Sequence, residues 1–188
     1  MKNPVFKKSL FALLLVAPLL GACKKDNDEE PTPDDDNEQI TTVRYELTPA
    51  GGGTPVTVQY RDLDGDGGAD PTIGTLTLAA GTTYTGKLVL LDETKNPAVI
   101  ISDEVKEEAD EHMFFFEPSN VNLTITRTDK DAKSLEVGLE TRVVAGTANA
   151  ANTTGTLKVT LRHQPGTKNG TFAPGDTDVE VRFPTAVR

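Results

Sequence analysis

The sequence predicts an all-β protein: an antiparallel, immunoglobulin-like β-sandwich that carries one short helix. Segments of strand length, in which apolar and polar residues alternate, recur along residues 40–188, and clusters of Gly, Pro, Asn and Asp separate them. Helical segments do not alternate with these strands, which argues against a parallel α/β sheet. Only the architecture is predicted, because the chain has no Trp and a single Cys for an inter-sheet disulfide. The predicted strands span residues 40–47, 56–60, 73–78, 83–91, 121–126, 135–144, 156–161 and 179–183.

One segment breaks the strand pattern and predicts the helix, at about residues 101–113. Its apolar residues recur at a four-residue spacing, which draws a single stripe along a helix: Ile101, Val105, Ala109 and Met113. Three phenylalanines follow directly at positions 114–116. We expect them to join the helix to the core of the sandwich, because adjacent aromatic residues are usually buried.

The first 22 residues predict a cleaved export signal. Lysines precede an apolar run at residues 9–20 that is too short to span a bilayer comfortably. The run ends on Leu20, Gly21, Ala22 and Cys23, which resembles the lipobox of bacterial lipoproteins. The resemblance implies that Cys23 carries acyl chains such as palmitate and becomes the mature N-terminus. Cysteine occurs nowhere else in the sequence, as expected for a chain exported to an oxidising compartment.

Residues 24–39 are rich in acids and contain no apolar residue, which predicts a solvated tether from Cys23 to a single domain at residues 40–188. The Cys-Lys-Lys-Asp start followed by acids is similar to the export signal of Bacteroidota surface lipoproteins. The chain as a whole resembles small strand-rich lipoproteins associated with TonB-dependent receptors. The resemblance implies a lipid-anchored protein on the extracellular side of the outer membrane, with a TonB-dependent receptor as its partner.

Charge and motifs exclude several classes of function. The chain has 19 Lys and Arg against 29 Asp and Glu, a net charge of -10, which argues against nucleic acid as a partner. It contains no Gly-x-Ser-x-Gly motif and no glycine loop for phosphates, and its one thiol is the predicted anchor. We therefore expect no enzymatic activity.

The first candidate site lies in an aspartate-rich loop at residues 62–70. It resembles the start of an EF-hand calcium loop, and the resemblance implies ligands at Asp62, Asp64, Asp66 and Asp70, with a turn at Gly67. The match then ends, because Ile73 stands where a bidentate Glu is expected. The alternative is a polar connection whose Asp and Gly residues supply turn geometry.

The second candidate site combines the chain's 2 histidines with a glutamate. On the predicted helix His112 falls on the buried stripe, and Glu108 lies one turn earlier at its edge. With His163 from the end of another strand, these residues could hold a transition metal such as zinc. The alternative is a histidine stabilised at a helix C-terminus, with His163 in a loop. The distance between His112 and His163 separates these interpretations.

Taken together, the sequence predicts a non-catalytic binding accessory that captures a divalent metal or other nutrient for a TonB-dependent transporter. The alternative is an adhesion or structural surface module in which calcium stiffens the loop at residues 62–70. Calcium and zinc are the cofactors that the two candidate sites would take.

Overall fold

The computed structural model describes residues 38–65 and 67–188, and Asp36–Arg188 form one compact unit. The predicted signal, Cys23 and most of the predicted tether lie outside the described residues. Glu38, which the sequence places in the tether, belongs to the compact unit. In the described part of the chain, no helix is long and apolar enough to cross a membrane.

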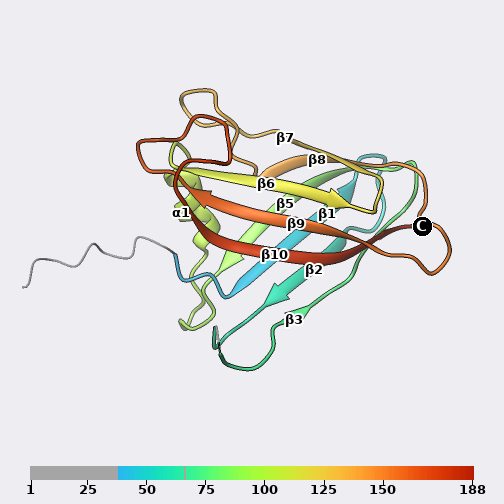
Figure 1. The fold of residues 1–188 in the computed structure, drawn as a ribbon, viewed down its shortest axis with the longest axis horizontal. Helices are drawn as coiled ribbons and strands as arrows, with labels where there is room; N and C mark the ends of the chain where they lie inside the picture. Colours follow the sequence, from blue (N-terminus) through green and yellow to red (C-terminus); the bar gives the residue numbers. More distant parts are fainter. Residues whose placement is uncertain (1–37, 66) are drawn as a thin grey trace, which may run out of the picture. The chain divides into compact units, whose positions relative to one another are not determined.

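The described strands form two sheets (Figure 1). The larger sheet has the order β3-β2-β1-β5-β8-β7 and the smaller one the order β4-β10-β9-β6. Neighbours are antiparallel, apart from the parallel pair of β4 and β10. The strands are β1 Thr42–Pro49, β2 Val56–Arg61, β3 Thr72–Ile73, β4 Leu76–Leu78, β5 Thr83–Leu91, β6 His112–Ser119, β7 Leu123–Arg127, β8 Glu140–Ala145, β9 Gly155–His163 and β10 Asp176–Val187. The predicted all-β sandwich with one short helix is confirmed.

The core lies between the two sheets, and alternating residues of both supply it. Val43, Tyr45 and Leu47 of β1 are fully buried, and Leu157 and Leu161 of β9 are buried in the same cluster. Such side chains each stabilise the fold by about 1.5–3 kcal/mol. The period of two is the one on which the strand predictions rested.

Tyr45 is the largest of the core side chains that are completely buried, and it depends on a glycine in the neighbouring strand β5. Its hydroxyl hydrogen-bonds to Thr141 Oγ1 at 2.6 Å, so the buried polar group has a partner. A Cβ atom on Gly86 of β5 would lie 2.7 Å from the Tyr45 ring and 2.4 Å from Thr141 Oγ1. Gly86 therefore makes room for the ring.

The helix exists but is shorter than predicted. α1 spans Ile101–Glu107 and buries Ile101 and Val105, as its apolar stripe indicates. It ends six residues before the predicted end, because His112 and Met113 pair with β9 as the start of strand β6. Tertiary pairing with a buried strand thus overrides the helical periodicity of the last turn.

Strand β6 lies at the edge of the smaller sheet, and its outer side is covered. The backbone N–H of Phe114 donates to the Val137 carbonyl at 2.7 Å, and the Arg127 guanidinium donates to the Phe114 carbonyl at 2.8 Å. Of the three phenylalanines, Phe114 is fully buried and Phe116 packs against the core. Phe115 is half-buried and packs edge-on against Phe172, with ring centroids 5.0 Å apart. The expectation of a core position therefore fits Phe114 and Phe116, because successive residues of a strand point to opposite faces.

Candidate metal site

The two histidines face each other across neighbouring strands. His112 begins β6, His163 ends β9, and the pairing register sets them directly opposite. Because the Phe114 N–H points away from β9, the Phe114–Leu161 and His112–His163 pairs are of the non-hydrogen-bonded kind, in which side chains are closest. Both histidines share a face with the core residues Phe114 and Leu161. Figure 1 shows that this end of the smaller sheet lies beside α1.

Three predicted ligands come together there. The two imidazole rings stack with centroids 4.5 Å apart and an interplanar angle of 5°. One ligand atom from each of Glu108, His112 and His163 lies within 4.8 Å of the other two. Glu108 reaches the site from the turn after α1, whereas the sequence placed Glu108 and His112 on one helix. The sequence thus predicted that these three residues come together, but it did not predict the turn and the strand pairing that bring them together.

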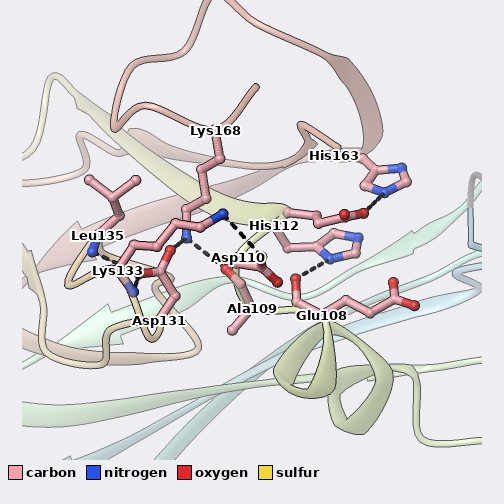
Figure 2. A network of polar contacts seen from close by, with 10 residues as sticks. Glu108, Ala109, Asp110, His112, Asp131, Lys133, Leu135, His163 and Lys168 are labelled. Carbon is pink, nitrogen blue, oxygen red and sulfur yellow. Dashed lines mark hydrogen bonds and ion pairs between the residues drawn. The ribbon is translucent and has the colours of Figure 1, made fainter. Parts of the chain in front are cut away.

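A backbone hydrogen bond fixes which nitrogen of His112 is available to a ligand. Nδ1 lies 3.1 Å from the carbonyl oxygen of Glu108 (Figure 2). A carbonyl can only accept, so Nδ1 carries the hydrogen and the neutral ring has its lone pair on Nε2. Burial lowers the pKa of His112, which favours this neutral form. Metal-binding histidines commonly donate their other N–H in this way.

Two carboxylates that the sequence analysis did not single out also face His112. Its Nε2 lies 3.7 Å from Asp178 and 3.9 Å from Glu38, whose side chains are 0% and 11% exposed. Burial is the main cause that raises the pKa of Glu38 to about 7, and Glu104 and Asp178 add to it. Burial likewise raises the pKa of Asp178 to about 6, although His163 and Arg162 oppose the shift. The site therefore gathers more negative charge than its surroundings neutralise.

A β-bulge turns Asp178 inward. The pairing of β10 with β9 shifts register between Thr177 and Val179, which leaves Asp178 as the extra residue. Bulges break the strict alternation of a strand and re-aim side chains. Asp178 and Val179 are consequently both half-buried, although they are neighbours.

The polar atoms of the cluster lack hydrogen-bond partners. They are Glu38 Oε2, His112 Nε2, His163 Nε2 and both carboxylate oxygens of Asp178. Glu111 Oε2 lies 3.5 Å from His163 Nε2, at the limit of a hydrogen bond. Native proteins pair most buried polar groups, so several unpaired ones in one place indicate a site for a ligand.

A neighbouring pair of charges holds the turn that carries Glu108. Lys168 donates to the Ala109 carbonyl at 2.7 Å and to Asp131 at 2.9 Å (Figure 2). The Lys168 and Asp131 side chains are both 1% exposed. They anchor the loop after β9 to the turn between α1 and β6.

The loop after β9 also needs a glycine close to His163. Gly175 has a φ of 74° and a Cβ atom there would lie 1.8 Å from the His163 carbonyl oxygen. Only glycine fits this position without a shift of the backbone. The end of β9 and the start of β10 are therefore packed tightly beside the site.

The aspartate-rich loop connects β2 and β3. Asp62 accepts a hydrogen bond from the Gly65 N–H at 2.9 Å, and Asp64 accepts one from the Ala69 N–H at 2.9 Å. Asp70 is exposed, and Asp66 lies outside the described residues. The two carboxylates thus support turn geometry, and calcium binding by Asp62, Asp64, Asp66 and Asp70 stays a prediction.

No match to this chain was found among protein-family models, curated proteins or solved structures. The functional argument therefore rests on the residues of the site.

Proposed function

We propose that the domain binds a divalent transition metal, zinc first, through Glu108, His112 and His163. The observation that supports this most is the convergence of the three ligand groups within 4.8 Å, with the free Nε2 of His112 facing buried carboxylates. Imidazole and carboxylate together suit zinc and its neighbours in the first transition row. A cation would also compensate the excess negative charge.

A zinc ion would set the spacing of the three ligand atoms. In a tetrahedral site with bonds of about 2.1 Å, ligand atoms lie about 3.4 Å apart. In the structure the three ligand atoms lie within 4.8 Å of one another, so no pair would have to approach by more than about 1.4 Å. Glu108 is exposed and can change rotamer. The stacked imidazole rings would also have to turn about their side-chain bonds, because each nitrogen lone pair lies in the plane of its ring. We expect Glu108 to close onto the histidines when the ion binds.

The role that we propose is capture of the metal without chemistry, on behalf of a TonB-dependent transporter. Its support is the sequence: the lipobox at Cys23 and the acidic segment after it resemble those of surface lipoproteins. Incorporation of labelled palmitate, and its loss in Cys23→Ser, would test the anchor. Cross-linking at the cell surface would test the transporter as a partner.

Calorimetry with zinc tests metal binding. The protein is residues 24–188, which contain the whole compact unit Asp36–Arg188. Wild type should bind one zinc ion per chain and melt at a higher temperature with zinc, and His112→Gln and His163→Gln should each weaken binding at least about 100-fold, since each removes a ligand.

Asp64→Asn is the matched control for this titration. It removes a carboxylate from the other candidate site and should leave zinc binding unchanged. The proposed function would be overturned if zinc, nickel and cobalt all produced no heat of binding and no shift in melting temperature.

A further inference from the structure

Two carboxylates outside the three-residue site face the same histidine from two further parts of the chain. Glu38 comes from the segment before β1, and Asp178 comes from the bulge in β10. The Asp178 side chain is 0% exposed, although the residue as a whole is half-buried, and neither of its carboxylate oxygens has a hydrogen-bond partner. Among the described residues, no partner was found for the Asp178 carboxylate or for the His112 nitrogen that it faces. A buried carboxylate beside a free imidazole nitrogen is the arrangement that a cation site requires.

We propose that Glu38 and Asp178 also ligate the ion, so that metal binding clamps the segment before β1 onto the smaller sheet. This inference rests on the proposed function and deepens it. Two imidazoles and three carboxylates would then surround the ion. The imidazoles come from β6 and β9, and the carboxylates come from the turn after α1, from β10 and from the segment before β1. Such a set suits divalent ions that accept five or six nitrogen and oxygen ligands, such as zinc, cobalt, nickel or manganese.

The position of Glu38 makes it the residue that responds to the ion. Thr41, three residues later, is fixed to the end of β5, because its N–H and its hydroxyl both donate to the Leu91 carbonyl, at 2.9 and 3.1 Å. Between them, Gln39 is exposed and Ile40 is half-buried. The Glu38 carboxylate faces Asp178 and Glu108 as well as His112, and like charges at close range repel each other.

A cation reverses the sign of this interaction. Without the ion, the Asp178 and Glu108 carboxylates oppose the docking of Glu38; with it, all three carboxylates are attracted to the same charge. The ion therefore couples its own capture to the point where the chain enters the sandwich. The Thr41 N–H is already bonded to Leu91, so the amides of residues 38–40 are the ones that should be open to exchange in the metal-free protein and protected in the metal-bound one.

The test compares wild type with Glu38→Gln and Asp178→Asn in residues 24–188. Zinc affinity is measured by competition with a coloured chelator, and backbone hydrogen exchange is followed in a peptide that covers residues 38–41. We expect each variant to bind zinc at least tenfold more weakly, and zinc to slow exchange at residues 38–40 in wild type only.

Glu107→Gln is the control, because Glu107 is exposed at the end of α1 and its loss removes the same charge nearby. Its zinc affinity should stay within twofold of wild type. The cobalt absorption spectrum adds a signature of ligation: it should change in Glu38→Gln and not in Glu107→Gln.

The outcomes separate the two proposals. Absence of zinc binding in wild type overturns the proposed function. Zinc binding in wild type that Glu38→Gln and Asp178→Asn leave unchanged, with no added protection at residues 38–40, overturns only the clamp. The exchange measurement needs wild type alone, so it decides the question even where a variant folds poorly.

Discussion

Two buried polar clusters lie side by side at one end of the sandwich, and they differ in how well their charges are matched (Figure 2). In the first, Lys168 and Asp131 pair at 2.9 Å, and Asp131 also accepts from the backbone N–H groups of Lys133 and Leu135, each at 2.8 Å. In the second, His112 and His163 meet carboxylates at 3.5–3.9 Å with unpaired atoms.

The difference separates a cluster whose charges are matched within the chain from one whose charges are not. Hydrogen bonding and the Lys168 charge lower the pKa of Asp131 against the effect of burial. Burial instead raises the pKa of Glu38 and Asp178. The first pair is thus satisfied within the chain, whereas the second cluster keeps the unmatched negative charge on which the proposed cation site rests.

The largest expected effect is the loss of the satisfied pair. Lys168→Met should destabilise the domain by about 3 to 5 kcal/mol, because it leaves a buried carboxylate without its partner. Urea denaturation at neutral pH measures this. A loss under about 1 kcal/mol would show that the pair contributes no more than a surface ion pair.

Removing a charge from the unsatisfied cluster should stabilise the domain, whereas Lys168→Met should destabilise it. Without metal and above neutral pH, Asp178→Asn should stabilise the domain by about 1 to 2 kcal/mol, because the buried carboxylate no longer has to ionise. Thermal denaturation in a chelating buffer measures this. Excess zinc should reverse the order, with wild type more stable. If Asp178→Asn destabilised the domain in the absence of metal, the Asp178 carboxylate would be stabilised by its surroundings, as the Asp131 carboxylate is.

The pH dependence of Glu38 should sharpen the same contrast with a smaller effect. Its pKa is about 7 in the fold against an ordinary 4.5, so the folded state binds more protons between these values. Stability from Glu38 is therefore lost as pH rises through this range, and wild type should fall relative to Glu38→Gln by about 1 kcal/mol. Denaturation of both proteins across the range, without metal, measures it. If the difference in stability between wild type and Glu38→Gln did not change with pH, the raised pKa of Glu38 would be contradicted.

The smallest effect is expected at an exposed ion pair near the same turn. Lys133 and Asp110 meet at 3.1 Å, but their side chains are 62% and 49% exposed. Lys133→Met should change stability by less than about 0.5 kcal/mol under the conditions used for Lys168→Met. A larger loss would show that burial is not what separates the two lysines.

The sequence predicted the fold class well because strand periodicity and turn residues are local signals. Val43, Tyr45 and Leu47 alternate as a half-buried strand must, and they are buried. The helix was predicted correctly at Ile101 and Val105. Its last six residues were predicted wrongly, because the pairing of His112 with β9 is a long-range interaction that periodicity does not report.

Three of the five residues in the candidate cluster could be predicted, and two could not. His112 and His163 stood out as the chain's only histidines, and Glu108 followed from its spacing. Asp178 reads as an outward residue of a strand, and only the bulge turns it inward. Glu38 closes an acidic run without apolar residues, so nothing local indicates that its side chain is mostly buried.

The covering of β6 bears on how this protein avoids self-association. An edge strand with free N–H and C=O groups is a template for a second chain, and Met113–Phe116 is an apolar run well suited to cross-β stacking. Val137 and Arg127 occupy both backbone groups of Phe114 on the outer side of this strand. The strand that carries His112 is thereby closed to intermolecular pairing at Phe114, two residues from the site.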